Sequence, residues 1–345
     1  MGYTRREEKV GAIFTSDTRL MSTSLSTSSS DAAQTLPANY AVLVKARLSL
    51  LVVMTSGVGY VMASPAPLDW LALLWTMAGT FLCACSANGL NQVIEHRRDA
   101  MMDRTRQRPV PTGSISPQHG WIFCMVTGYA GLSMLALLVN LPAAGLALAT
   151  MLIYVLLYTP MKAHTTLNTL VGAVVGAIPP MIGWVAASGM ITTGGLILAA
   201  ILFVWQLPHF LSLAWMYRDD YNRAGFKMLP GVPGGEHITC EVVLLTTLLL
   251  IPLGLTATMI GTAGAVYGIC SLLLGLGFLV PAVKFFRRRD RASARSVFFA
   301  SLLYLPLLMS VMIADRGDEL IPGRTAVLVL QEMDAAPASV PPNDL

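Results

Sequence analysis

The chain of 345 residues is 54% hydrophobic and only 12% charged, with a formal net charge of +4. Water-soluble domains carry about 25% charged residues, so this composition excludes an ordinary soluble protein. The small positive charge does not indicate nucleic-acid binding, because membrane orientation explains the placement of the basic residues along the chain.

Residues 1–39 are rich in serine and threonine, a composition that cannot form a packed core. We expect a disordered segment there, then a membrane domain over 40–315 and a poorly ordered, proline-rich tail over 316–345. Arg5 and Arg6 are not followed by an apolar stretch, so no cleavable signal peptide is expected.

Repeated apolar runs of about 20 residues predict an all-α membrane protein with nine transmembrane helices. The predicted spans are 42–63, 69–90, 119–139, 143–159, 168–188, 194–216, 241–262, 265–285 and 297–314. Fifteen Lys and Arg residues lie in the segments after spans two, four, six and eight, whereas the opposite loops contain none. Basic loops remain in the cytoplasm, so these segments and the N-terminus are predicted to be cytoplasmic.

The second apolar run leads directly into a charged segment. Asn91, Glu95, Asp99 and Asp103 recur every four residues, so a helix that continues past Leu90 places them on one face. Like charges at this spacing repel by about 0.2–0.5 kcal/mol per pair on an isolated helix. The stack therefore indicates a bound divalent cation, with Asn91, Glu95 and Asp99 as predicted metal ligands. Asn91 alternatively contacts the diphosphate or hydrogen-bonds a neighbouring helix.

A second acidic segment follows the sixth span and contains Asp219 and Asp220. The two acidic segments lie four spans apart, which suggests two parallel four-helix halves and a ninth helix around a central cavity. Carboxylates that face each other across this cavity would hold Mg²⁺ together with a diphosphate. Asp219 and Asp220 are the ligands predicted from this side, although Asp219 alternatively is only solvated.

Basic residues near these carboxylates predict where a diphosphate binds, because Arg offers a planar fork to two oxygens and Lys a point charge. The predicted diphosphate ligands are Arg104, Arg108, Lys162 and Arg218. Orientation of the neighbouring spans is their alternative role, and the two roles are compatible.

A metal-bound diphosphate is a good leaving group, and a dry cavity protects an allylic carbocation from water. An intramembrane prenyl transfer would need these parts in this order from the surface to the interior of the membrane. The residues predicted to be catalytic are Glu95, Asp99, Lys162 and Asp220.

These motifs resemble those of the UbiA-type intramembrane prenyltransferases. The first aspartate-rich motif of that family is similar to Asn91-Gln92-x-x-Glu95-x-x-x-Asp99, followed by Arg104-Thr105-x-x-Arg108-Pro109. Further matches are Tyr158-Thr159-Pro160-x-Lys162, Asn168-Thr169, Trp205-Gln206-x-Pro208-His209-Phe210 and Asp220-Tyr221. The resemblance covers about 40–315, and its Asn-Gln-Glu form is similar to the protohaem IX farnesyltransferase branch. The family usually has arginine where this chain has Ala163.

The resemblance implies that farnesyl diphosphate and haem b are the substrates, that haem o is the product and that Mg²⁺ is the cofactor. It also implies a haem-handling partner for haem a synthesis, with the lipid bilayer as surroundings and no nucleic acid. Low lysine content favours a bacterial inner membrane, with the active site on the cytoplasmic side.

His209 lies in the sixth span, ten residues before Asp219 and about 15 Å deeper along a helix. An ionisable group at such depth is a functional candidate, and haem iron commonly takes a histidine ligand. We therefore expect His209 to contact haem or to handle a proton. The alternative is a neutral histidine that hydrogen-bonds across helices with Gln206 or another partner.

Two rival functions stay open on the sequence. The same fold could act on another acceptor, such as an aromatic acid or a quinone precursor, because a fold does not fix its substrate. The Asn-Gln-Glu and Trp-Gln-x-Pro-His-Phe motifs favour haem over these acceptors. A secondary transporter with parallel repeats is the second rival, but its site would lie at the middle of the membrane, whereas the acidic residues here cluster at one end of the spans.

Overall fold

The computed structural model describes residues 35–317, so the predictions of disorder for 1–34 and for most of the tail, 318–345, lie outside the described residues. All regular secondary structure in the described part is helical. The elements are α1 (Leu36–Leu43), α2 (Ala46–Ala63), α3 (Trp70–Asp99), α4 (Pro117–Leu138), α5 (Leu141–Leu152), the π-helical η1 (Ile153–Tyr158), α6 (Thr159–Met161), α7 (Asn168–Ser188), α8 (Thr193–Met216), α9 (Arg218–Arg223), the 3-10 helix η2 (Leu229–Gly231), α10 (Gly235–Met259), α11 (Ala265–Arg288) and α12 (Arg291–Ala314).

Nine segments of the described chain are long and apolar enough to cross a membrane. Eight are single helices, and the ninth joins α5, η1 and α6 over Leu141–Met161. They follow the nine predicted spans in order, which confirms the all-α membrane fold class.

The first and second spans differ from their predicted limits. Lys45 has a left-handed backbone conformation, with φ of 47°, which separates α1 from α2. Helix α1 begins at Leu36, so the packed domain starts four residues before the predicted boundary. Helix α3 continues nine residues beyond the apolar run and ends at Asp99, so Asp103 lies outside the helix on which we had expected it.

Short polar side chains fix where several spans begin, because they accept hydrogen bonds from backbone N–H groups that have no partner within the helix. Asp69 accepts from Leu71 and Ala72 at the start of α3. Asn140 and Asp290 cap α5 and α12 in the same way.

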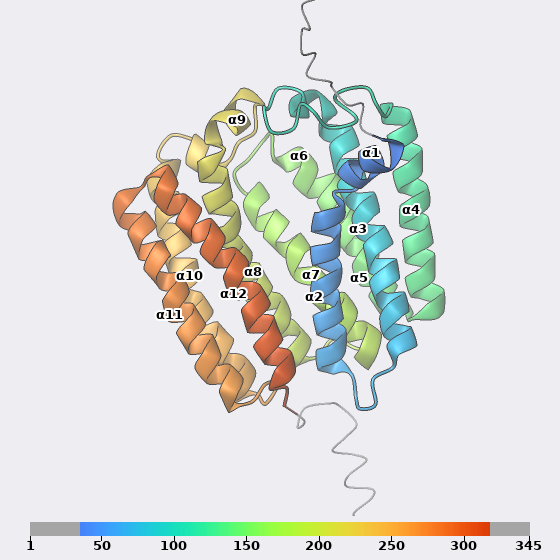
Figure 1. Cartoon of the computed structure of the whole chain (residues 1–345), viewed down its shortest axis with the longest axis vertical. Helices are drawn as coiled ribbons and strands as arrows, with labels where there is room; N and C mark the ends of the chain where they lie inside the picture. The colour runs from blue at the N-terminus through green and yellow to red at the C-terminus, as the bar shows by residue number, and fades with distance from the viewer. Residues whose placement is uncertain (1–34, 318–345) are drawn as a thin grey trace, which may run out of the picture. The chain divides into compact units, whose positions relative to one another are not determined.

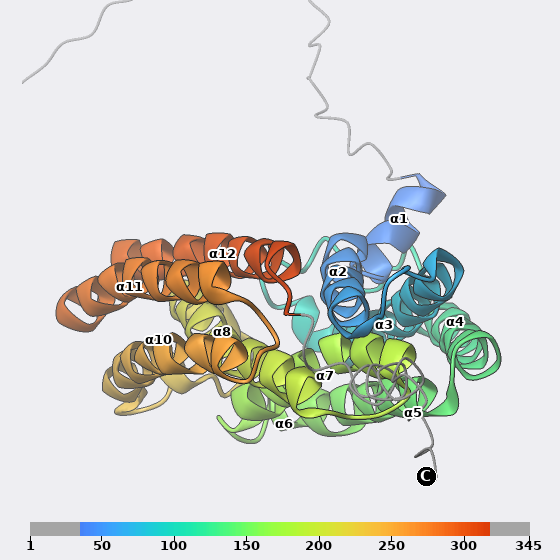
Figure 2. The same cartoon turned by 90° about the horizontal axis from the view of Figure 1, so that it is seen from below.

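The described helices pack into two neighbouring groups, and Figure 2 shows the two groups side by side. The larger apolar core joins α8, α10, α11 and α12. Smaller cores join α3 to α4 and α5, with α7 packed against α2 and α5. Glycines allow α2 and α7 to approach closely: a Cβ at Gly183 would lie 1.7 Å from the Ser56 carbonyl oxygen, and one at Gly59 would lie 1.9 Å from that of Pro180.

The charged segments gather at one end of the helices, the upper end in Figure 1, which we call the motif end. Helices α3, α6 and α8 all end there, and α1 and α9 lie there as well (Figure 1). The loops 100–116 and 217–234 therefore meet above the ends of their helices. At the opposite end, Arg316 donates to the carbonyl oxygens of Val61 and Ser64 and so ties the end of α12 to α2.

Candidate active site

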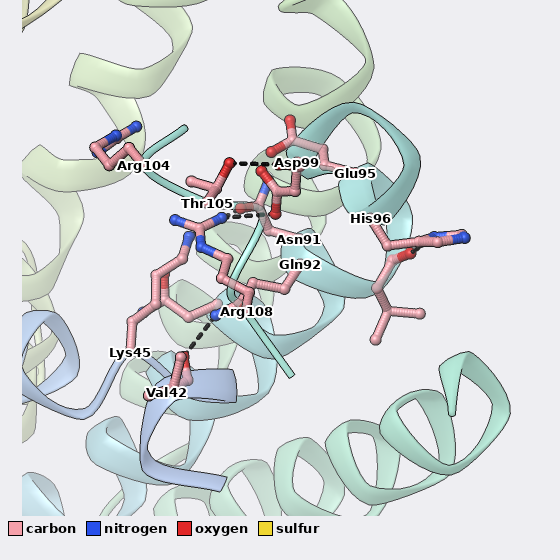
Figure 3. Close-up of polar contacts among 12 residues, drawn as sticks. Val42, Lys45, Asn91, Gln92, Glu95, His96, Asp99, Arg104, Thr105 and Arg108 are labelled. Carbon is pink, nitrogen blue, oxygen red and sulfur yellow. Dashed lines mark hydrogen bonds and ion pairs between the residues drawn. The ribbon is translucent and has the colours of Figure 1, made fainter. Parts of the chain in front are cut away.

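The last two turns of α3 carry a buried acidic face. Asn91, Glu95 and Asp99 follow each other at intervals of four residues, and their exposed fractions are 1%, 6% and 1%. Figure 3 shows their side chains on the same side of the helix. The spacing derived from the sequence is therefore confirmed for these three residues.

Each carboxylate of this face is paired with one cation from another segment. Lys162, which follows α6, has its Nζ 3.0 Å from both carboxylate oxygens of Glu95. Arg108 donates from Nη1 to Oδ2 of Asp99 at 2.6 Å. The Thr105 hydroxyl donates to the Asp99 backbone oxygen, so loop 100–108 folds back onto the end of α3 (Figure 3).

Lys45 also joins this site, and the sequence analysis missed it. Its Nζ donates to Oδ1 of Asn91 at 2.9 Å, and the Asn91 amide donates in turn to the Thr159 hydroxyl. The Gln92 amide donates to the backbone oxygens of Val42 and Leu43 and so holds the end of α1, just before Lys45 (Figure 3). A lysine at the start of a span normally signals orientation alone, so only its left-handed backbone and buried contacts single it out.

The site has more positive than negative groups, since three cations (Lys45, Arg108 and Lys162) surround the two carboxylates of α3. Burial, and then the charges of Arg108 and Lys162, lower the pKa of Lys45 from 10.5 to about 7. Burial also acts to lower the pKa of Lys162, but the Glu95 carboxylate outweighs it and the pKa lies above its ordinary value. Such a surplus of positive charge favours a multiply charged anion.

The second acidic segment meets the first through a bridge of exposed groups. Arg223 donates to Oδ2 of Asp103 at 2.6 Å and also to Asp220. Arg104 donates to the Tyr221 hydroxyl at 3.2 Å and lies over the Tyr217 ring, 5.1 Å from its centroid. Asp220 thus lies beside the loop that carries Arg108, while no hydrogen bond or ion pair joins it to Glu95 or Asp99 among the residues described.

Two predicted site residues lie apart from this cluster. The Asp219 side chain is 86% exposed and lies 3.7 Å from its neighbour Arg218. Arg218 itself pairs with Glu236 at the start of α10 and lies over the Trp215 ring. The geometry therefore does not bring Asp219 or Arg218 to the carboxylates of α3, because Asp219 faces solvent and Arg218 is held by Glu236 and Trp215.

His209 lies deeper on α8 and belongs to a separate group of side chains. Its Nδ1 is 2.8 Å from the Ser301 hydroxyl on α12. Gln206, which we had named as one partner, instead donates to backbone oxygens of Leu202 and Ala173. The cross-helix hydrogen bond of the alternative interpretation is therefore present, with Ser301 as its partner.

Comparison with known proteins places this arrangement in a family. The model of the UbiA prenyltransferase family matches residues 52–303. The chain is 44% identical over 279 residues to "Protoheme IX farnesyltransferase, mitochondrial" of Arabidopsis thaliana, covering 80% of this chain and 64% of that protein. It is 41% identical to "Protoheme IX farnesyltransferase" of Solibacter usitatus, covering 81% and 98% respectively. The chain belongs to the UbiA prenyltransferase family.

A solved structure of this family supports the same fold. The UbiA homologue from Archaeoglobus fulgidus bound to GPP and Mg²⁺ superimposes with a TM-score of 0.64 at 14% identity, over 79% of this chain and 99% of that one. At this identity the likeness establishes the fold alone.

The α3 face of this prenyltransferase fits a divalent cation. Oε1 of Glu95 is buried and has the Lys162 ammonium at 3.0 Å, but it accepts no hydrogen bond from any described residue, so it can take a further ligand. The described residues contain no group of three or more His, Cys, Asp or Glu side chains that could enclose a metal. Mg²⁺ is usually held by one or two carboxylates and by substrate phosphate oxygens, so two carboxylates on one face are a suitable set.

Proposed function

We propose that the protein transfers the farnesyl group of farnesyl diphosphate to a vinyl group of haem b, with addition of water, to give haem o. The observation that carries the donor half is the group of three partly buried basic side chains around the two carboxylates at the end of α3. The acceptor half is supported by the names of the relatives, since proteins called protohaem IX farnesyltransferase match 80% or more of this chain.

The residues of the chain bind and orient the donor. Arg108 and Lys162 reach the α3 face from two different loops, so they can bind separate oxygens of one diphosphate. Arg104 and Asp220 lie beside this site in the adjoining loops and would extend it toward the diphosphate. Asn91, Glu95 and Asp99 are the residues that would hold Mg²⁺, which when bound neutralises charge on the leaving diphosphate.

The apolar spans below the motif end serve the second half of the reaction. The bond from C1 of the farnesyl group to the diphosphate oxygen breaks, and its electron pair leaves with the diphosphate. The vinyl π electrons then form the new carbon–carbon bond, and water adds to the carbon beside the porphyrin with loss of one proton. Apolar helices protect the farnesyl cation from water before it reaches the vinyl group.

The placement of the protein follows from the same proposal. The motif end faces the cytoplasm, because the basic residues concentrate in its loops, and the membrane is a bacterial inner membrane. The catalytic domain extends over 40–315, together with the first residues of α1 from Leu36. A separate partner receives haem o for conversion to haem a.

The test is a transfer assay with the full chain purified in detergent and lipid. Radiolabelled farnesyl diphosphate and haem b should give labelled haem o, and chelation of divalent metal should stop the reaction. Asp99→Asn should abolish transfer while the protein still inserts into membranes. Transfer of the label to an aromatic acid or quinone precursor but not to haem would refute the proposed acceptor.

A further inference from the structure

The imidazole of His209 is enclosed by aromatic rings from two helices. Trp205, one turn earlier on α8, stacks on it at 5.1 Å with an angle of 19° between the rings. Phe298 of α12 stacks at 4.9 Å with an angle of 25°. Two nearly parallel neighbours leave the imidazole plane little freedom to rotate. The Trp205 indole also donates to the backbone oxygen of Ser301 at 2.9 Å, which links the stack to α12.

The Ser301 hydroxyl determines which imidazole nitrogen carries the proton. Its Oγ lies 2.6 Å from the Phe298 backbone oxygen, which can only accept, so the single hydroxyl proton is used there. The hydroxyl oxygen must therefore accept from Nδ1 of His209 at 2.8 Å. Nδ1 carries the proton, and Nε2 has its lone pair free.

Nε2 of His209 has no recorded partner in the part of the chain that the structure describes. Within the described residues, no hydrogen bond or ion pair involves Nε2, and no acidic or basic side chain contacts the imidazole. A proton handler needs a partner to receive the proton, and the described structure offers none. An unprotonated Nε2 with a fixed ring plane is instead the form in which histidine binds metals, including haem iron.

We propose that Nε2 of His209 is an axial ligand of the haem iron and that Ser301 is the positioning residue that fixes its tautomer. This inference rests on the proposed function, because haem must be the acceptor. His209 lies seven residues, about 10 Å, before the end of α8, so iron ligation would hold the porphyrin below the diphosphate site. It also predicts that the enzyme distinguishes haem from the iron-free porphyrin.

Haem titration of the full chain in detergent tests this arrangement. His209→Ala should remove the histidine signal from the Soret band and from the iron–histidine Raman band. Ser301→Ala should weaken haem binding about 10–100-fold, as loss of a ligand's hydrogen-bond partner does at other metal sites, and should shift the Raman band. Ser301→Thr keeps the hydroxyl and should restore both. Binding of iron-free protoporphyrin IX should be the same in all four proteins.

Ser296 provides the matched control, because it lies on the same helix and its hydroxyl donates to the Ala292 backbone oxygen, away from His209. Ser296→Ala should bind haem like the wild type. If His209→Ala leaves the haem spectrum unchanged, iron ligation is wrong even where farnesyl transfer to haem is observed. If only Ser301→Ala is without effect, the tautomer assignment is wrong. If the wild-type protein neither binds nor farnesylates haem, the proposed function itself fails.

Discussion

Glu95 and Lys162 form an ion pair that is almost wholly removed from water, with side chains 5% and 11% exposed. Withdrawing two charges from water costs several kcal/mol for each ion, and their attraction repays this only with good geometry. An apolar pair of similar volume would stabilise a fold at least as well. The charges are therefore better explained by a ligand that uses them, as the diphosphate and its metal would.

This pair gives a prediction for stability and activity together. Glu95→Gln leaves the Lys162 ammonium buried without its counter-charge, and Lys162→Met leaves the carboxylate in the same state. Each change should destabilise the protein by about 3–5 kcal/mol, seen as a lower melting temperature in detergent. The double variant should regain most of that loss, because no unpaired charge remains.

Activity should not recover with stability. All three variants should lose at least about 100-fold in farnesyl transfer, because each lacks the carboxylate that would hold Mg²⁺, the ammonium that would bind the diphosphate, or both. A double variant as unstable as the single ones would contradict mutual dependence of the two charges. Near-normal transfer by Glu95→Gln would contradict the role of the α3 face.

At the scale of elements, the loops 100–116 and 217–234 are joined by groups that lie at the surface. Arg223 links Asp103 to Asp220, and its own side chain is 51% exposed. The backbone N–H of Lys227 donates to the Lys162 oxygen at 2.7 Å, so the second loop also borders the loop that carries Lys162. These contacts hold the basic residues of different loops in one place.

Arg223→Ala should separate the effects of these contacts on stability and on function. Exposed ion pairs contribute only about 0.2–1 kcal/mol, so the melting temperature should change little. Local opening should rise, giving faster amide hydrogen exchange in both loops, and kcat/KM for farnesyl diphosphate should fall about tenfold, or about 1.4 kcal/mol.

Arg106→Ala is the control for this change, since Arg106 lies 3.7 Å from Asp103 of its own loop and forms no ion pair with a second segment among the described residues. It removes an equal charge that neighbours the same Asp103 carboxylate, but from the loop of Asp103 itself, and should affect exchange and kcat/KM much less. Equal effects of the two variants would show that net charge matters and that the bridge does not.

The sequence predicts the buried face of α3 well, because a four-residue interval in a helix leaves one geometric outcome. It predicts the geometry of the loops poorly. Asp103 follows the same four-residue interval but lies beyond the end of α3, and Arg218 pairs with Glu236, which is eighteen residues away. Such pairings depend on how separate loops fold back, which no local pattern contains. Lys45 was missed because orientation already explained a lysine in that position.

For the whole molecule, the nine spans follow from the length and apolarity of the runs, but their packing does not. Side chains that face lipid and those that face other helices are equally apolar, so no periodic pattern separates them. Close contact between α2 and α7 depends on Gly59 and Gly183, two of the 29 glycines in the chain. The sequence does not distinguish Gly59 and Gly183 from glycines, such as Gly145, at which an added Cβ would meet open space.

Orientation in the membrane is the remaining property of the whole molecule, and the distribution of Lys and Arg predicts it. Thr112 is exposed in the loop after α3, at the motif end, and Met190 is 55% exposed in the turn between α7 and α8, at the opposite end. Cysteines introduced at these two positions report on opposite sides. Background labelling should be low, because four native cysteines are buried and Cys270 is partly covered.

In intact cells, a membrane-impermeant maleimide should label Met190→Cys but not Thr112→Cys, and permeabilised cells should label both. The end of α3 and the loop that follows it have five basic residues within 97–108, whereas 189–193 has none, and basic loops are retained in the cytoplasm. Labelling of Thr112→Cys alone in intact cells would reverse the topology. The diphosphate site would then face away from the cytoplasm, and the proposed placement of the active site would be wrong although the fold would stand.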